Sequence, residues 1–315
     1  MMYDKLKIWV DRGIVGNQLL AIPNCLTDVQ SVTNYLTGEV REYGNLDSLR
    51  VSVYSNGLSI VGSLAKYRHS DNLFMLNRQT TQEAIADISD RLRVDLGAAK
   101  VSSLEFGTHF TMSNPVPEYL ALMGEAPYLK RCRYTDNTLY YRSKGKREYK
   151  VHTFYDKAEE SNKRGVALPQ SLAGANLLRY ELRYNKQLNQ QLKTNTVTAA
   201  LLYDERFYRS MLQRYSDVYF SINKTNVLKT NIMSEIKTVG DAFEVAMARL
   251  INQAGHEEIE TFLSKLRQAK VFDDPKYYTR LKKKFQDVAG KVRLTRTDDL
   301  IKELDEKIRS VVLRE

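Results

Sequence analysis

The chain has 315 residues, of which 43% are hydrophobic and 27% charged, and its 48 Lys+Arg against 38 Asp+Glu give a formal charge of +10. No stretch approaches the roughly 20 apolar residues of a membrane-spanning helix, no secretory apolar core opens the chain, and two cysteines without CxxC spacing exclude a disulfide framework or thiolate zinc site. We therefore expect a cytoplasmic protein without a membrane partner, whose positive charge favours a polyanion such as nucleic acid.

Strands and helices alternate over the first two-thirds of the chain. Alternating polarity and β-branched or aromatic content predict strands at Leu6–Val10, Leu49–Tyr54, Leu58–Leu64, Ser102–Met112, Thr138–Arg142, Tyr149–Tyr155 and Leu177–Tyr184. The turn Ser55-Asn56-Gly57 predicts a hairpin, because Asn-Gly tolerates positive φ. Helices are predicted at Thr27–Leu36, Thr81–Leu96, Pro117–Met123 and Asp156–Asn162.

Composition changes near residue 195, and the remainder has the apolar spacing of helices. The helical period runs from Leu201 to Tyr215 and from Ile232 to Leu250, and further helices are predicted at Glu258–Ala269, Tyr277–Val288 and Asp298–Leu313. We therefore predict two domains, residues 1–195 with the strands and residues 196–315 as an all-helical accessory domain.

The predicted strand Ser102–Met112 carries a candidate metal-binding face. A period of two places Glu105, Gly107 and His109 together, with Gly107 leaving room where something approaches closely. Carboxylate oxygen and imidazole nitrogen suit Mg²⁺ or Mn²⁺. A surface strand that carries these residues by chance is the simpler interpretation of this segment alone.

The predicted strand Leu177–Tyr184 places Arg179, Glu181 and Arg183 on one face. Glu181 is then a second metal ligand or a base, and the two arginines are candidates for holding phosphate through paired hydrogen bonds. A solvent-facing edge strand with ion pairs is the alternative.

Tyr155 lies at the end of a predicted strand, before a helix that begins near Asp156 and whose dipole favours anions. Lys157 points to the same side while the chain is extended, so its ammonium group can lower the phenol's pKa or steady a scissile phosphate. Packing is the alternative role for such a tyrosine.

Tyrosines alternate with basic residues between residues 131 and 150, a mixture that suits stacking on unpaired bases and neutralisation of phosphates. An ordinary hairpin with inward-facing tyrosines is the alternative. The candidate DNA contacts are Arg142, Lys144, Arg147 and Lys150, together with Arg179 and Arg183. Tyr140 and Tyr141 are rival nucleophiles if the strand register differs from the predicted one.

The order of these segments resembles the gene II/X replication proteins of filamentous phages and related plasmids. The matching stretches lie between about residues 50 and 184: Gly62-Ser-Leu-Ala-Lys66 followed by Asn72, Leu104-Glu-Phe-Gly-Thr-His109, Tyr155-Asp-Lys157-Ala-Glu-Glu160 and Arg179-Tyr-Glu181. Glu105 stands where an Asp is expected, and the paired histidines of the wider His-hydrophobe-His nickases are absent.

The resemblance implies an α+β nickase core around an antiparallel sheet, ferredoxin-like and related to the His-hydrophobe-His nickases, followed by the helical domain. It implies a rolling-circle replication initiator in which Tyr155 attacks single-stranded origin DNA, leaving a 5′-phosphotyrosyl bond and a 3′-hydroxyl primer. Glu105 and Glu181, with His109, are the implied ligands of Mg²⁺ or Mn²⁺, and Lys157 and Arg179 are candidates for electrostatic support. A host helicase and a polymerase are the further expected partners.

Two other functions stay open at this point. A mobilisation relaxase uses the same tyrosine chemistry at a transfer origin, and only genetic context separates it from a replication initiator. A non-catalytic origin-binding protein shares the charge and the aromatic residues but has no use for a tyrosine aligned with metal ligands.

Overall fold

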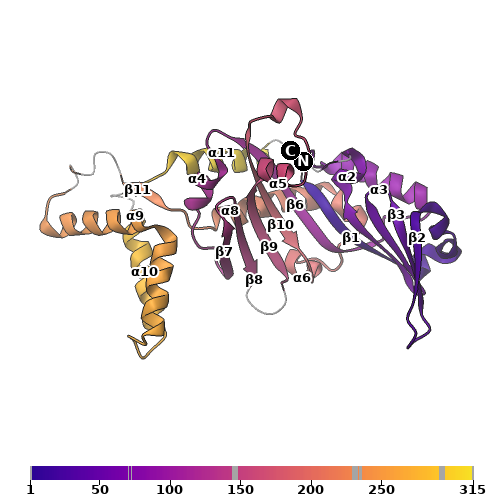
Figure 1. The fold of residues 1–315 in the computed structure, drawn as a ribbon, viewed down its shortest axis with the longest axis horizontal. Helices are drawn as coiled ribbons and strands as arrows, with labels where there is room; N and C mark the ends of the chain where they lie inside the picture. The colour runs from indigo at the N-terminus through magenta and orange to yellow at the C-terminus, as the bar shows by residue number, and fades with distance from the viewer. Residues whose placement is uncertain are drawn as a thin grey trace.

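The computed structural model describes residues 2–69, 71, 73–143, 148–228, 233, 236–290 and 295–313. Its centre is a ten-stranded sheet in the order β2-β3-β4-β5-β1-β6-β10-β9-β8-β7, whose neighbouring strands are antiparallel (Figure 1). The strands are β1 (Tyr3–Asp11), β2 (Thr27–Thr33), β3 (Val40–Leu46), β4 (Leu49–Tyr54), β5 (Gly57–Ser63), β6 (Lys100–Met112), β7 (Leu129–Thr135), β8 (Thr138–Ser143), β9 (Lys150–Asp156) and β10 (Asn176–Tyr184). The predicted α+β class with an antiparallel sheet is confirmed.

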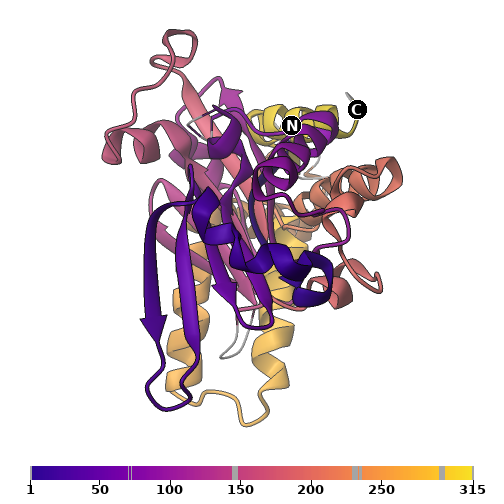
Figure 2. The same ribbon diagram turned by 90° about the vertical axis from the view of Figure 1, so that its right-hand side faces the viewer.

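One face of the sheet packs against helices and forms the hydrophobic core. Tyr208 and Tyr215 of α8 (Glu205–Phe220) contact Phe106 of β6, each with ring centroids 6.1 Å apart. The helices α3 (Arg78–Leu92) and α11 (Asp299–Leu313) lie on the same side as α8 in the edge view of Figure 2. We call this side the core face. The shorter helices are α1 (Arg12–Val15), α2 (Leu64–His69), α4 (Val116–Ala121), α5 (Lys157–Lys163), α6 (Leu188–Leu192) and α7 (Ala199–Leu202), with 3-10 turns at Gly16–Leu20, Ile22–Cys25 and Gln170–Leu172.

The opposite face carries the polar residues that the sequence singles out, and we call it the site face. The helix α5 follows β9 there, and it begins where predicted, because the Asp156 side chain accepts a hydrogen bond from the Glu159 backbone at 2.9 Å and so caps the helix. Because successive strand residues point to opposite faces, each β9, β10 and β6 side chain is assigned to a face by its position.

The C-terminal region is helical, as predicted, with one small two-stranded ribbon, β11 (Asn226–Leu228) and β12 (Thr295–Thr297). The helix α9 (Val239–Gln268) kinks at Gly255, where φ is 73°, and packs against α10 (Lys276–Ala289). The apolar residues of α8 and α11 belong to the same core as the sheet, so this core continues past residue 195. The division into domains at that residue remains a prediction. Among the described residues no helix is long and apolar enough to cross a membrane.

The helix predicted at Thr27–Leu36 is wrong, because this segment forms β2 and pairs with β3. Its residues are exposed throughout, so no apolar stripe holds a helix against the core, and the β-branched residues Val29, Val32 and Thr33 favour extended backbone. The other predicted strands and helices of the first two-thirds are confirmed within a few residues at each end, whereas β3 and β7 were not predicted.

Candidate active site

The registers of β6, β10 and β9 bring the predicted site residues together on the site face. The opposed pairs along β10 and β6 are Arg179 with His109, Glu181 with Gly107 and Arg183 with Glu105, and Tyr155 of β9 lies opposite Arg179. Leu104, Phe106 and Phe110 of β6 lie on the core face and are buried, as the strand alternation predicts.

Three carboxylates from three strands meet at the centre of this face. One oxygen each of Asp4, Glu105 and Glu181 lies within 4.8 Å of the others. Asp4 was not among the predicted ligands. It reaches the group because β1 has a register shift against β6 between Tyr3 and Leu6, which turns Asp4 away from the core face. Oxygen donors of this kind suit a hard divalent cation.

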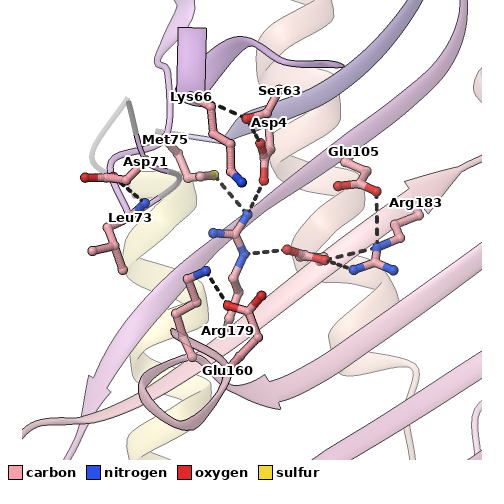
Figure 3. A network of polar contacts seen from close by, with 12 residues as sticks. Asp4, Ser63, Lys66, Asp71, Leu73, Met75, Glu105, Glu160, Arg179 and Arg183 are labelled. Atoms are coloured by element: carbon pink, nitrogen blue, oxygen red, sulfur yellow. Dashed lines mark hydrogen bonds and ion pairs between the residues drawn. The ribbon is translucent and has the colours of Figure 1, made fainter. Parts of the chain in front are cut away.

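Two arginines neutralise most of this negative charge (Figure 3). The fully buried Arg179 guanidinium donates to Asp4 Oδ2 at 2.6 Å and to Glu181 Oε1. Arg183 donates to Glu181 Oε2 at 2.6 Å, lies 3.4 Å from Glu105 Oε1 and is 31% exposed in its side chain. The network therefore has one permanently buried cation and one that can turn towards solvent.

The network holds the two glutamates in opposite ionisation states. Burial raises the pKa of Glu181, but the charges of Arg179 and Arg183 and their hydrogen bonds outweigh it and lower that pKa to about 2. Burial raises the pKa of Glu105 to about 7, because its partner Arg183 is shared with Glu181 and the neighbouring carboxylates add repulsion. Glu181 is thus a fixed anion, and Glu105 changes charge near neutral pH.

Tyr155 lies next to this carboxylate group. Its hydroxyl donates a hydrogen bond to Glu181 Oε1 at 3.0 Å. Burial and the negative charge of Glu181 hold the phenol's pKa well above its ordinary value. The side chain also lines a cavity of about 350 Å³ together with Tyr140 and Arg183. A phenol and a guanidinium therefore border the same cavity.

Two further predicted residues lie close to the group without joining it. Lys157 is buried and donates to Glu160 Oε2 at 2.6 Å, and burial lowers its pKa. Burial and the charges of Arg179 and Lys157 lower the pKa of His109 to about 4, so the imidazole is neutral at physiological pH. His109 Nδ1 has no hydrogen-bond partner among the described residues, which leaves it available to a ligand.

The two rival tyrosines lie on opposite faces of the sheet. Tyr141 is buried on the core face, where its hydroxyl donates to the Gly124 carbonyl at 2.7 Å, so it faces away from the carboxylates. Tyr140 shares the site face with Tyr155, because it lies opposite Thr153. Of the two, only Tyr140 remains near the candidate site.

Only some of the predicted DNA contacts lie on the site face with access to solvent. Arg142 and Arg183 lie on the site face and are partly exposed, with Arg142 4.8 Å above the Tyr140 ring. Arg179 has its partners inside the protein, and the alternation of β9 puts Lys150 on the core face. Lys144 and Arg147, and Asn72 of the resembling stretch, lie outside the described residues.

Gly107 is needed for the close approach of β6 and β10. A side chain there would collide with the Tyr180 carbonyl oxygen and meet Glu181 Cα at 2.8 Å. The close approach that the sequence suggested at this glycine is therefore real, and the neighbour is the strand that carries Glu181.

Comparisons with known proteins identify a family for this chain. Residues 43–203, just over half of the chain, match the model of a phage family described as the N-terminal part of a replication-associated protein. Comparison with curated proteins gave no match. Among solved structures, the "Rolling Circle Replication Initiator Protein from Geobacillus stearothermophilus" is similar, with 10% identity and a TM-score of 0.40 over 72% of this chain and 87% of that chain.

Proposed function

Because the chain belongs to this family of phage replication-associated proteins, we propose that it starts rolling-circle replication by nicking single-stranded origin DNA with Tyr155. The observation that carries the proposal is the 3.0 Å hydrogen bond between the Tyr155 hydroxyl and Glu181, a member of the three-carboxylate group. A non-catalytic DNA-binding protein has no need for a tyrosine in this position.

In the proposed step, the Tyr155 oxygen loses its proton and forms a bond to the scissile phosphorus. The bond from phosphorus to the 3′-oxygen breaks, and this oxygen takes up a proton and becomes the primer hydroxyl. The product is a 5′-phosphotyrosyl ester, which keeps the energy of the phosphodiester for later rejoining because a phenolate is a good leaving group.

The residues of the carboxylate group fit a divalent metal ion. Asp4, Glu105 and Glu181 supply oxygen donors, and the unpartnered Nδ1 of His109 is a nearby nitrogen donor. Such an ion, Mg²⁺ or Mn²⁺, would polarise the scissile phosphate and offset the charge that develops on it. These oxygen and nitrogen donors are compatible with both Mg²⁺ and Mn²⁺, so they do not predict which of the two ions is bound.

The three basic residues of the site have different roles in this proposal. Arg179 is a positioning residue, because its buried guanidinium fixes Asp4 and Glu181. Arg183, which is partly exposed and lines the cavity, is placed to contact the phosphate. Lys157 adds positive charge near Tyr155 and, with its lowered pKa, is a candidate for moving the proton. In the absence of a bound phosphate, the phenol is protonated at neutral pH.

The test uses single-stranded DNA from the parent replicon, labelled at its 3′ end so that the label stays with the 5′-phosphotyrosyl product. Incubation with Mn²⁺ and denaturing electrophoresis should give a labelled protein band for wild type and for Tyr140→Phe, and none for Tyr155→Phe. An adduct with Tyr155→Phe would reject this nucleophile, and no adduct with wild type would reject the enzyme in favour of a non-catalytic origin-binding protein.

A mobilisation relaxase would give the same adduct. Replication assays in cells separate the two, because an initiator supports copying of a plasmid that lacks any transfer function. Cytoplasmic localisation and the participation of a host helicase and polymerase remain predictions that follow from this function.

A further inference from the structure

The half of the sheet formed by β3, β4, β5 and β1 carries an ordered row of side chains that the proposed reaction does not use. The Trp9 and Tyr54 rings have centroids 5.7 Å apart. Arg41 lies 5.5 Å from the centre of the Tyr54 ring and 5.1 Å from that of Tyr43, and Arg50 lies 3.9 Å from Tyr43. We call these five residues the aromatic-arginine row.

Small residues on β5 allow the row to form. The strand β5 separates β1 from β4, and on this face it contributes Gly57 and Ser59. A side chain at Gly57 would meet the Trp9 ring at 2.9 Å. Trp9 can therefore lie across β5 and reach Tyr54, so the row extends over four neighbouring strands.

The row lies on the site face. Lys7 lies opposite Ser103 of β6, which is two residues from Glu105 and so points to the same side. Trp9 is two residues beyond Lys7 on β1 and shares its side. Tyr155 lies three strands from Trp9 across the sheet and about nine residues further along it, so spacings of ~4.8 Å between strands and ~3.3 Å per residue place the two side chains roughly 30 Å apart.

The surroundings of the row are positively charged. Arg41 is half-buried, and the exposed basic residues on this part of the site face are Lys5, Lys7, Arg50 and Lys100. The nearby acidic side chains are fewer: Asp11 accepts from Trp9 Nε1 at 2.8 Å, Asp28 from Asn45 Nδ2 at 3.2 Å and Glu39 from Ser55 Oγ at 3.2 Å. This charge complements a phosphate backbone.

We propose that the aromatic-arginine row binds unpaired bases of the DNA strand whose phosphodiester reaches Tyr155. Aromatic rings and guanidinium groups on a flat sheet stack on bases of any sequence, whereas the bases of a duplex have their faces covered by their neighbours. The arginines are already held over tyrosine rings, so ordering them costs little on binding. The identity of the strand rests on the proposed function; the binding itself is tested separately.

Trp9 is the only tryptophan of the chain, so its emission reports on this row alone. The Tyr155→Phe protein is titrated with oligothymidylate of about 16 nucleotides, the upper site size of single-strand-binding folds. Saturable quenching of the emission is expected with the single strand but not with a duplex of equal length. Quenching by the duplex alone would overturn the proposal.

Affinity is measured in parallel by the anisotropy of a labelled oligonucleotide. Tyr43→Leu and Arg50→Gln should each weaken binding about 5- to 100-fold, and Arg50→Gln should reduce the slope of log K against log salt by about 0.7. Arg280→Gln is the matched control, because Arg280 also lies over a tyrosine ring, 5.4 Å from that of Tyr277, but on α10. It should leave affinity unchanged.

The outcomes separate this proposal from the proposed function. If anisotropy shows binding while the Trp9 emission and the Arg50→Gln affinity stay unchanged, the DNA lies elsewhere and the row is not its platform. That result leaves the nicking reaction intact. If the row passes both tests but wild type forms no covalent adduct, the binding surface stands and the nuclease is rejected.

Discussion

Glu105 is the carboxylate whose ionisation opposes folding, and removing its charge should stabilise the metal-free protein. Its pKa is ordinarily 4.5 and rises to about 7 in the fold through burial. The stabilisation that this raised pKa provides is complete below pH 4.5 and is lost as the pH rises through 7. At 1.36 kcal/mol per pKa unit, the ionised side chain disfavours the folded state by about 3 kcal/mol above that pH.

The substitution Glu105→Gln keeps the shape and removes the charge. The attraction of Arg183, 3.4 Å from Glu105, is already contained in the raised pKa and therefore in this free energy. The expected gain is about 3 kcal/mol at about pH 8, with a change below about 1 kcal/mol at pH 4.5.

Urea denaturation in the presence of a chelator measures this difference at the two pH values. Glu258→Gln, at an exposed position of α9, is the control and should change stability at neither pH. If the proposed metal site is correct, added Mn²⁺ should stabilise wild type at the higher pH and have less effect on Glu105→Gln, which lacks one of the proposed carboxylate ligands. If the variant is destabilised at about pH 8 in chelator, the reasoning from burial is refuted.

Three further substitutions test the site. Arg179→Leu should lower the free energy of unfolding in urea by about 3–5 kcal/mol, because Asp4 and Glu181 lose their buried counter-charge; a loss under about 1 kcal/mol would contradict that role. Gly107→Ala should lower it by about 1–3 kcal/mol through the collision with β10, and an unchanged melting temperature would argue against the close approach. Tyr141→Phe should cost about 1 kcal/mol for the lost hydrogen bond and still form the DNA adduct, whereas loss of the adduct in a folded protein would move the nucleophile to Tyr141.

Much of the fold follows from local patterns because the central strands bury one face. The strands β6, β9 and β10 have apolar residues at alternate positions, and this alternation fixed both their extent and the face of Glu105, Glu181 and Tyr155. At the ends of the sheet the signal weakens. The outer strands β2 and β7 have few buried residues, so their pairing with β3 and β8 depends on contacts that the local sequence does not display.

Asp4, the member of the carboxylate group that the sequence did not predict, shows where strand alternation misleads. It has the same parity as Leu6 and Ile8, which a regular strand would place on the core face together with Asp4. The extra residue between Tyr3 and Leu6 reverses this assignment. Tyr3 and Leu6 are both buried on the core face although they lie three positions apart, and this odd spacing of apolar residues is what a bulge between them produces.

The two arginines of the network differ in how firmly the protein encloses them. Arg179, buried with Asp4 and Glu181, forms an ion pair with each of these two carboxylates and so fixes their positions. Arg183 can leave because its side chain is 31% exposed, and its departure would remove the cation that it shares between Glu181 and Glu105. A phosphate that attracts Arg183 would therefore take one positive charge away from beside the carboxylate group, which favours the binding of a divalent cation in its place. DNA and metal ion should consequently bind more tightly together than either does alone.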